Sequence, residues 1–207
     1  MLFTIKRGAR VLAIAAGALA VAAGPAHAKG ALANPYDCTP GGPLAQSFAG
    51  FGDAALYTPV ENAGLESGAA AWTLTGGAAV AAGNEPWHIG GAADRSSLSL
   101  PAGATAVTAP ICIDPSYPYF RLFARGAAGQ SLKIEVLAYD TKGRLLKTTP
   151  YAYTPAGAAW APTPSIAIDT FDYSKAGVTA APVSFRFTAG NAGFAIDDVY
   201  VDPWARH

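Results

Sequence analysis

The chain is short of histidine, cysteine and charge, and these shortages exclude several classes of protein. It has 14 lysines and arginines against 14 aspartates and glutamates, so its formal net charge at pH 7 is zero. Nucleic acids and anionic membrane surfaces are poor partners for a chain without excess positive charge. It has no His-Glu-x-x-His motif, no Gly-x-Ser-x-Gly turn and no glycine-rich phosphate loop. We therefore expect a protein that is not an enzyme and binds no nucleic acid.

An enzymatic alternative would depend on very few residues. After the first thirty residues the histidines are His88 and the terminal His207. His88 has no neighbouring nucleophile, which is more typical of a packing residue than of a general base. Glycosidase chemistry would need two carboxylates about 5 to 9 Å apart. The sequence alone does not place any two of its candidates at that separation; these are Glu85, Glu135, Asp140 and Asp169.

The first thirty residues have the character of a secretory signal peptide. Lys6, Arg7 and Arg10 precede an apolar run over 11–23, and the segment closes on Ala26-His27-Ala28. This order of charge, apolar run and small residues predicts cleavage after Ala28, with 1–28 as the signal peptide. The alternative, an uncleaved anchor, is disfavoured because a membrane-spanning helix needs about 20 apolar residues. No second long apolar run follows, so we expect a secreted, extracellular or cell-surface protein without a membrane span after cleavage.

Two cysteines, Cys38 and Cys112, fall in the part of the chain expected to be exported. An even count in an oxidising compartment favours one disulfide. Closing a loop of about 75 residues would stabilise the fold by about 4 kcal/mol in the chain-entropy model. Reactive thiols or metal ligands are the alternative, but neither cysteine has a Cys or His neighbour at ligand spacing.

Beyond the signal peptide the sequence predicts a single all-β domain. Breakers such as Asn34-Pro35 and the run 39–43 make 29–59 an irregular N-terminal arm. From residue 60 to 207, short runs with period-two alternation are separated by Gly, Pro and Asp, and no long helix is evident. We expect an antiparallel β-sandwich of the jelly-roll kind. The expected strands are 72–75, 78–82, 96–100, 119–125, 131–139, 145–149, 165–169, 183–189 and 194–201.

Two of these strands are regular enough to assign faces. Over 132–139 and 183–188 apolar residues alternate with polar ones, as in an antiparallel sheet with one solvent-exposed face. The segment Asp140-Thr141-Lys142-Gly143 predicts a hairpin turn. The expected core residues are Leu132, Ile134, Val136, Ala138, Val183, Phe185 and Phe187.

Motifs at opposite ends of the domain resemble one known superfamily. The segment 61–68, followed by Trp72, resembles the opening strand of galactose-binding-like, carbohydrate-binding-module jelly rolls, and 194–201 resembles their Ile-Asp-Asp-Val closing strand. The segments 83–86 (Gly-Asn-Glu-Pro) and 97–101 (Ser-Leu-Ser-Leu-Pro) are most similar to those of secreted actinobacterial proteins of unassigned function. The resemblance implies a jelly-roll fold and carbohydrate binding.

The same resemblance implies a structural calcium ion between the first and last strands. Its ligands carry over as Glu66 and Asp197, although Ala63 and Leu65 depart from the usual Gly and Phe. Strand alternation would place Asp197 on the core face with Val199 and Val201, where a carboxylate must be neutralised. Calcium, which accepts six to eight oxygen ligands, is one solution. Capping of backbone N–H groups, or pairing with an arginine, is the alternative.

The predicted polar sheet face offers a set of candidate ligand-binding residues. Aromatic and charged side chains on such a face suit a saccharide. They equally suit an ordinary solvated face with cross-strand ion pairs. The sequence thus favours a carbohydrate-binding, non-catalytic extracellular protein whose partner is an extracellular or cell-wall glycan, with a structural or adhesive surface protein as the alternative. The candidate residues are Tyr119, Arg121, Phe123, Glu135, Tyr139 and Arg186.

Overall fold

A computed structural model describes residues 36–38, 42–113, 119–169 and 180–202. The chain divides into two units, Met1–Leu32 and Ala33–His207, and every described residue belongs to the second. The predicted signal peptide, 1–28, lies outside the described residues, as does Trp204. No helix in the described ranges is long and apolar enough to cross a membrane.

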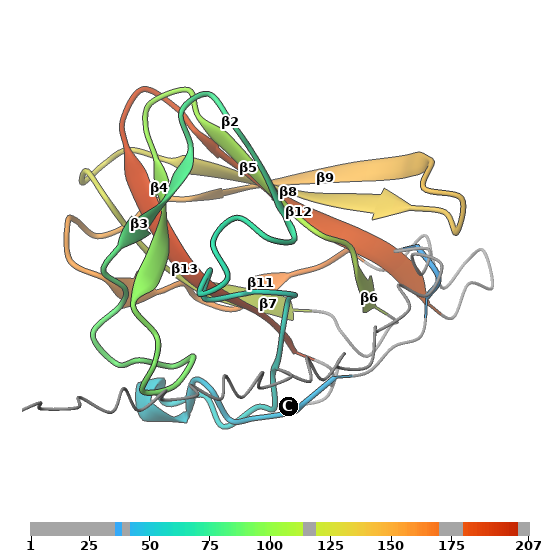
Figure 1. Ribbon diagram of the computed structural model, residues 1–207, viewed down its shortest axis with the longest axis horizontal. Coiled ribbons are helices and arrows are strands. Elements are labelled where there is room, and N and C mark those ends of the chain that lie inside the picture. The colour runs from blue at the N-terminus through green and yellow to red at the C-terminus, as the bar shows by residue number, and fades with distance from the viewer. Residues whose placement is uncertain (1–35, 39–41, 114–118, 170–179, 203–207) are drawn as a thin grey trace, which may run out of the picture. The chain divides into compact units, whose positions relative to one another are not determined.

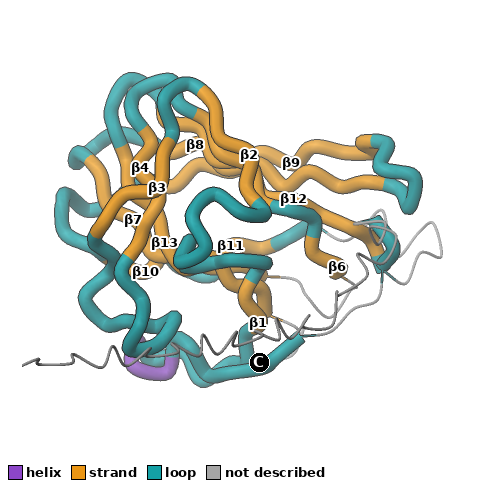
Figure 2. The backbone as a smooth tube through the Cα atoms, viewed as in Figure 1, coloured by secondary structure: helices purple, strands orange, loops and turns teal. Residues whose placement is uncertain are grey.

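The described residues form two antiparallel sheets packed as a sandwich (Figures 1 and 2). In the seven-stranded sheet the order is β10 (Ala161–Pro162), β7 (Tyr119–Gly126), β13 (Phe194–Asp202), β4 (Ser96–Leu100) and β3 (Ala79–Ala82), with β1 (Thr58–Pro59) on β13 and β11 (Ile166–Ala167) on β7. In the six-stranded sheet the order is β2 (Trp72–Thr75), β5 (Thr105–Thr108), β12 (Ala181–Ala189), β8 (Leu132–Tyr139) and β9 (Leu145–Tyr153), with β6 (Ile111–Ile113) on β12. The predicted jelly-roll-type β-sandwich is confirmed.

The core lies between the sheets and follows the predicted alternation. All seven expected core residues of β8 and β12 are buried there. Trp72 joins them, its ring 6.1 Å from that of Phe187. Period-two alternation predicts the buried residues of these strands well, because successive side chains of a strand point alternately toward the core and away from it.

The Asp140–Gly143 turn is also confirmed. Asp140 Oδ1 accepts hydrogen bonds from the backbone N–H groups of Lys142 and Arg144, at 3.0 and 2.8 Å. Gly143 has φ +78°, a conformation that costs glycine little. The turn joins β8 to β9, and this hairpin projects at one side of Figure 1.

The predicted boundary at residue 59 does not separate two structural parts. Ala33–His207 is one compact unit, and β1, at the end of the expected arm, pairs with β13. The arm also contains the short helix η1 (Ala49–Phe51) and a bridge between Ala45 and Tyr57. Strands β1, β5, β6 and β10 are not among the expected strands. Of these, β1, β6 and β10 have only two or three residues, too few to show a period.

The disulfide prediction is confirmed. Cys38 and Cys112 are bonded, with Cα atoms 5.2 Å apart, inside the range that a disulfide permits. The bond ties the N-terminal segment to β6 at the edge of the six-stranded sheet.

A β-bulge in β13 changes the face on which Asp197 lies. The pairing of β13 with β7 shifts register between Asp197 and Tyr200, and Asp198 has φ +51°. Ile196 and Val199 both enter the core, so the alternation changes phase between them. The expectation that Asp197 shares the core face with Val199 is therefore wrong: Asp197 lies opposite Phe123 on the outer face of the sheet.

Candidate functional site

The outer face of the seven-stranded sheet carries the residues from which a site can be built. Register pairs Ala195 with Ser99 on one side and with Arg125 on the other, and pairs Asp197 with Phe123. Side chains directly opposite in an antiparallel pair lie on the same face. The outward-facing side chains are Arg121, Phe123 and Arg125 from β7, Ala195, Asp197 and Tyr200 from β13, and Ser97 and Ser99 from β4.

Part of this face is covered by the segment 45–57. Phe48 and Tyr57 pack with Phe123 and Tyr200 in an aromatic cluster that is almost fully buried. The centroid of the Phe48 ring lies 5.4 Å from that of the Phe123 ring, and these two rings are stacked. It lies 5.9 Å from the centroid of the Tyr200 ring, which meets it edge to face. The N-terminal arm is thus part of the fold because it buries these rings.

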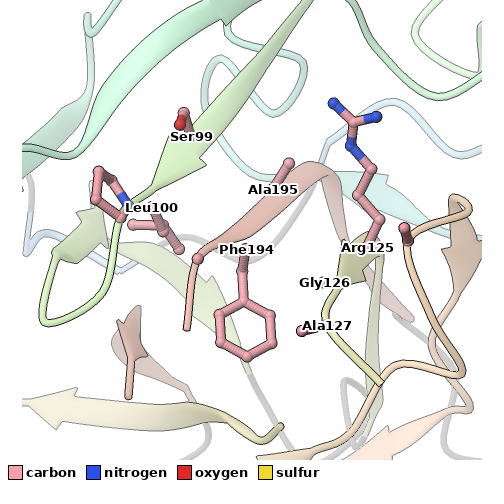
Figure 3. A pocket seen from close by; sticks show the side chains of 10 residues that line it. Ser99, Leu100, Arg125, Gly126, Ala127, Phe194 and Ala195 are labelled. Atoms are coloured by element: carbon pink, nitrogen blue, oxygen red, sulfur yellow. The ribbon is translucent and has the colours of Figure 1, made fainter. Parts of the chain in front are cut away.

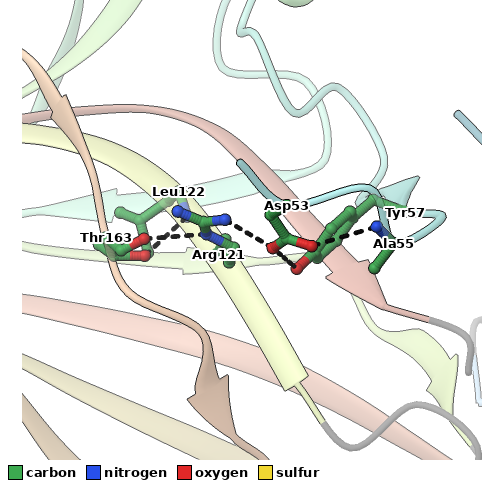
Figure 4. Close-up of polar contacts among 6 residues, drawn as sticks. All are labelled: Asp53, Ala55, Tyr57, Arg121, Leu122 and Thr163. Carbon is green, nitrogen blue, oxygen red and sulfur yellow. Dashed lines mark hydrogen bonds and ion pairs between the residues drawn. The ribbon is translucent and has the colours of Figure 1, made fainter. Parts of the chain in front are cut away.

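A polar network fastens the same segment to β7 (Figure 4). Arg121 donates from one terminal nitrogen to Asp53 at 2.6 Å and from Nε to the Thr163 carbonyl oxygen at 2.9 Å. Its guanidinium also lies 4.4 Å from the centre of the Phe48 ring. Tyr57 donates to Asp53 at 2.6 Å. The hydrogen bonds from Tyr57, Ala55 and Arg121 lower the pKa of the Asp53 carboxyl, and burial opposes them.

The expectation that six residues form one binding face is wrong, because they belong to two sheets. Tyr119, Arg121 and Phe123 lie on β7 of the seven-stranded sheet, and Arg121 and Phe123 are buried under the arm. The strands that carry the other three, β8 and β12, belong to the six-stranded sheet. Alternation along a strand predicts whether a side chain points toward the core or away from it, but not to which of the two sheets the strand belongs.

On the six-stranded sheet the predicted alternative, cross-strand ion pairing, is observed. Arg186 and Glu135 are register partners joined at 2.7 Å, and Lys133 also reaches Glu135 at 2.8 Å. The Arg186 hydrogen bond and charge lower the pKa of Glu135 to about 2. The Tyr139 ring packs in a tilted orientation against the ring of Tyr36, with centroids 5.2 Å apart. These residues are therefore occupied by contacts within the chain.

The loop between β3 and β4 is organised by Glu85. Its carboxylate, fully buried, accepts backbone N–H groups of Trp87, of His88 at 3.0 Å and of Ile89 at 2.5 Å. These bonds close a turn that presents Trp87, which is 46% exposed. The Trp87 ring packs edge-on against Phe51 at 4.8 Å and lies 5.5 Å from Phe123. Trp87 is thus an exposed aromatic side chain whose ring packs against Phe51 and Phe123.

His88 contributes to the shape of this loop. Its Nδ1 lies 3.0 Å from the Asp94 carbonyl oxygen and 3.1 Å from Asn84 Nδ2. Its backbone has φ +52°. These contacts agree with the packing role expected from the sequence.

Three buried carboxylates meet beside this loop. Glu85, Asp94 and Asp198 each place an oxygen within 4.8 Å of the others. Asp94 and Asp198 are 2% and 1% exposed, and none of their four carboxylate oxygens has a hydrogen-bond partner among the described residues. A buried polar group without a partner costs about 1 to 3 kcal/mol, and a charged group costs more. The cluster therefore requires protons or a cation.

Burial and the neighbouring acidic groups raise the pKa values of the aspartates in this region. Burial, followed by the charges of Asp198 and Asp94, raises the pKa of Asp197 to about 9. Burial, followed by the charges of Asp94 and Glu85, raises the pKa of Asp198 to about 8. Burial also raises the pKa of Asp94. Without a cation the carboxyls of Asp197 and Asp198 hold protons near neutral pH.

The donor set fits a hard, oxygen-preferring cation such as Ca²⁺. Two oxygens bound to one Ca²⁺ at 2.3 to 2.6 Å are at most about 5 Å apart, which the three carboxylates satisfy. Two glycines wall the cluster: a Cβ on Gly64 or Gly90 would lie 3.3 to 3.4 Å from the oxygens of Asp94 and Asp198. Larger side chains there would intrude on the cluster.

The predicted ligands Glu66 and Asp197 lie beside this cluster but make other contacts. Glu66 Oε1 accepts the N–H groups of Arg95 and Ser96 at 2.8 and 2.7 Å. Asp197 accepts those of Asp198 at 2.9 Å and Glu85 at 3.4 Å. The backbone-capping alternative is thus observed for Asp197. The opening and closing motifs do approach each other, but through Gly64 and Asp198.

Sequence reasoning missed Asp94 and Asp198 as cluster members for a physical reason. Asp198 occupies the bulge, which period-two alternation does not register. One signal was available: aspartate is among the few residues that accept positive φ readily, and two adjacent aspartates follow Ile196. Glu85 stands in its Gly-Asn-Glu-Pro segment and among the possible glycosidase carboxylates, but it is not predicted from the sequence as a metal ligand.

Further along the same face lies an open hollow of about 350 Å³. Figure 3 shows the side chains of Ser99, Ala195 and Arg125 extending to one side of the sheet, with the Phe194 ring on the other. The guanidinium of Arg125 lies 4.9 Å from the centre of the Trp160 ring. A Cβ on Gly126 would lie 2.5 Å from the Phe194 ring, so only glycine fits there.

The fold and the site define an all-β sandwich with a carboxylate cluster, an exposed tryptophan and a hollow on one face. No family model and no curated protein matches the sequence. The chain is similar to the enzymatically active domain of bacteriophage CBA120 tailspike protein 4, with TM-score 0.48 and 17% identity over 70% of this chain and 21% of that one. It spans about a fifth of that domain's length.

Two carbohydrate-binding modules are also similar to this chain. TmCBM61, solved with β-1,4-galactotriose, has TM-score 0.45 and 14% identity over 70% of this chain and 97% of the module. The family 11 module of Clostridium thermocellum, solved with a β-1,3-1,4-mixed-linked tetrasaccharide, has TM-score 0.44 and 11% identity over 73% of this chain and 98% of the module.

Proposed function

We propose that this chain is an extracellular, non-catalytic carbohydrate-binding protein that carries a structural calcium ion. The saccharide lies on the outer face of the seven-stranded sheet, on the uncovered side that includes Trp87. The six-stranded sheet is not assigned a ligand because Glu135 and Arg186 neutralise each other there.

Trp87 is the observation that supports this proposal. An exposed tryptophan offers a flat apolar face, and sugar rings present C–H groups that pack against such faces. Phe51 and Phe123 hold the ring from behind, and Glu85 fixes its backbone. Little conformational entropy is then lost when a ligand binds.

The calcium ion would lie among Glu85, Asp94 and Asp198. Its charge would balance carboxylates that have no other counter-charge among the described residues. Because Glu85 also caps the Trp87 turn, the ion would hold together the loop, β13 and the opening segment at Gly64. Its role is structural.

A glycan array with the purified protein tests the function. We expect binding to at least one extracellular or cell-wall saccharide, and a loss of about tenfold or more in affinity on Trp87→Ala. Leu145→Ala is the matched control, because Leu145 is 49% exposed on the other sheet. Melting temperatures of both variants report folding. No binding across the array, or equal binding by Trp87→Ala, would refute the proposal.

A structural or adhesive surface protein is the rival function. The observation in its favour is the exposed pair Leu145 and Leu146 on β9, an edge strand of the six-stranded sheet. Exposed edge strands with apolar side chains favour pairing with another chain. Concentration-dependent assembly that Leu145→Lys abolishes, together with a silent array, would support this rival.

A further inference from the structure

We propose that the hollow beside Arg125 binds an acidic sugar, a uronate whose carboxylate pairs with the Arg125 guanidinium. The inference rests on the proposed function, from which it takes the ligand to be a saccharide. It adds the chemical class of that ligand and a second contact point along the same sheet face as Trp87.

The hollow has the size and lining for a single sugar unit. Its volume of about 350 Å³ is at the small end of the range for small-molecule sites. Its lining includes the register row Ser99, Ala195 and Arg125 on the outer face of the sheet. Ala195 at the centre leaves space above the sheet, and Ser99 offers a hydroxyl that can donate to or accept from a sugar hydroxyl. The lining also includes the small residues Gly126, Ala127, Ala158 and Gly193, and the larger apolar residues Leu100, Pro101 and Phe194.

Arg125 is the charged member of the residues that line the hollow. Its guanidinium lies over Trp160 at 4.9 Å, and in such stacking the N–H groups at the guanidinium edge stay available for an acceptor. No carboxylate pairs with Arg125 within the described part of the chain. The planar fork therefore remains free for a bidentate carboxylate.

A comparison within β7 shows what distinguishes Arg125. Arg121, four residues earlier on the same face, already donates to Asp53 and to the Thr163 carbonyl oxygen under the arm. Arg121 is 7% exposed and Arg125 is exposed. Strand β7 thus carries Arg121, which binds the N-terminal arm, and Arg125, which lines the hollow.

The single guanidinium favours a carboxylate over a sulfate or phosphate. A tetrahedral anion presents three oxygens and is usually bound by several donors. The hollow supplies one planar fork with neutral neighbours, and this fork can donate two parallel hydrogen bonds to the two oxygens of a planar carboxylate. A uronate attaches that anion to a sugar ring.

Calorimetric titration with paired probes tests the inference. The probes are oligomers of galacturonate, glucuronate and mannuronate, each beside its methyl ester, which keeps the ring and hydroxyls but removes the charge. We expect at least one acid to bind about tenfold or more tightly than its ester, since a hydrogen bond to a charged group is worth about that much. Arg125→Gln should remove the difference by weakening the acid alone.

The controls separate the guanidinium from general charge. Arg125→Lys keeps the charge without the fork and should recover only part of the preference. Arg144→Gln removes an equally positive, exposed arginine from the β8–β9 turn and should change nothing. Equal affinity for acid and ester, a preference for sulfated oligosaccharides, or an unaltered preference in Arg125→Gln would each overturn the inference.

The failures of the two proposals can be told apart. If neutral saccharides bind through Trp87 while acid and ester bind alike, the uronate inference fails and the proposed function stands. If no saccharide of either kind binds, both fail.

Discussion

Asp94 and Asp198 place their carboxylates side by side inside the protein, although about half of the chain separates them in sequence. Both are buried, and neither carboxylate accepts a hydrogen bond from the part of the chain that the structure describes. Two such groups cannot both stay ionised without a counter-charge. This pair of carboxylates leads to two predictions, one for the protein with bound calcium and one for the metal-free protein.

Calcium should raise the melting temperature of the protein. An ion that binds only the folded state at a hundred times its Kd adds about 2.7 kcal/mol, or about 5 to 10 °C for a unit of this size. Asp198→Asn should abolish the shift, whereas Asp140→Asn, which changes an acid in the β8–β9 turn, should keep it.

A second readout distinguishes a metal ligand from a residue needed for folding. In chelator, Asp198→Asn should melt no lower than the unaltered protein, because the amide replaces a buried carboxyl that the metal-free protein keeps protonated. A melting temperature indifferent to both calcium and chelator would rule out the ion.

Without metal, the protein should lose stability as the pH rises. The pKa values of Asp197 and Asp198 are raised to about 9 and about 8, against about 3.9 in an unfolded chain. Between these values the folded state keeps protons that the unfolded state releases, so the free energy of unfolding falls from about pH 4 to about pH 9.

Urea unfolding in chelator at pH 5, 7 and 9 measures this effect. The urea concentration at the unfolding midpoint should decrease from pH 5 to pH 9. The stabilisation by added calcium should increase over the same range, because the ion displaces protons from the carboxyls and fewer are bound at higher pH. The double variant Asp197→Asn, Asp198→Asn should flatten the dependence. A midpoint that rises with pH would contradict the raised pKa values.

Breaking the Arg121–Asp53 pair should destabilise the fold. Asp53→Ala leaves a buried guanidinium without its anion, and we expect a loss of about 2 to 3 kcal/mol in urea unfolding. Lys147→Ala, which breaks the exposed pair with Asp169, should cost less than about 1 kcal/mol. The double variant Asp53→Ala, Arg121→Met should cost less than the sum of its single changes. Strict additivity would show that the two side chains act independently.

Replacing both cysteines with serine should lower stability by about 4 kcal/mol, because the bond between Cys38 and Cys112 closes a long loop. Chemical denaturation of the double variant, beside the reduced protein, gives the value. An unchanged midpoint in both would mean that the bond does not stabilise the fold.

The sequence by itself determined the class of fold and the contents of its core. Alternation in β8 and β12 depends on neighbouring residues along one strand, and it identified Phe185, Ile134 and their neighbours as buried. The two cysteines, the Asp140–Gly143 turn and most of the longer strands follow from equally local patterns. Resemblance at both ends of the domain also directed attention to carboxylates near the first and last strands.

Only the tertiary structure decided where those side chains meet. The assignment of Arg121 and Glu135 to different sheets depends on pairing between strands far apart in sequence, which alternation does not encode. The bulge at Asp198 reverses the phase of β13 and brings this residue, instead of Asp197, into the carboxylate cluster with Asp94 and Glu85. Phe48 and Asp53 come from a segment without periodicity, and they bury one end of the outer face because their partners, Phe123 and Arg121, are supplied by β7.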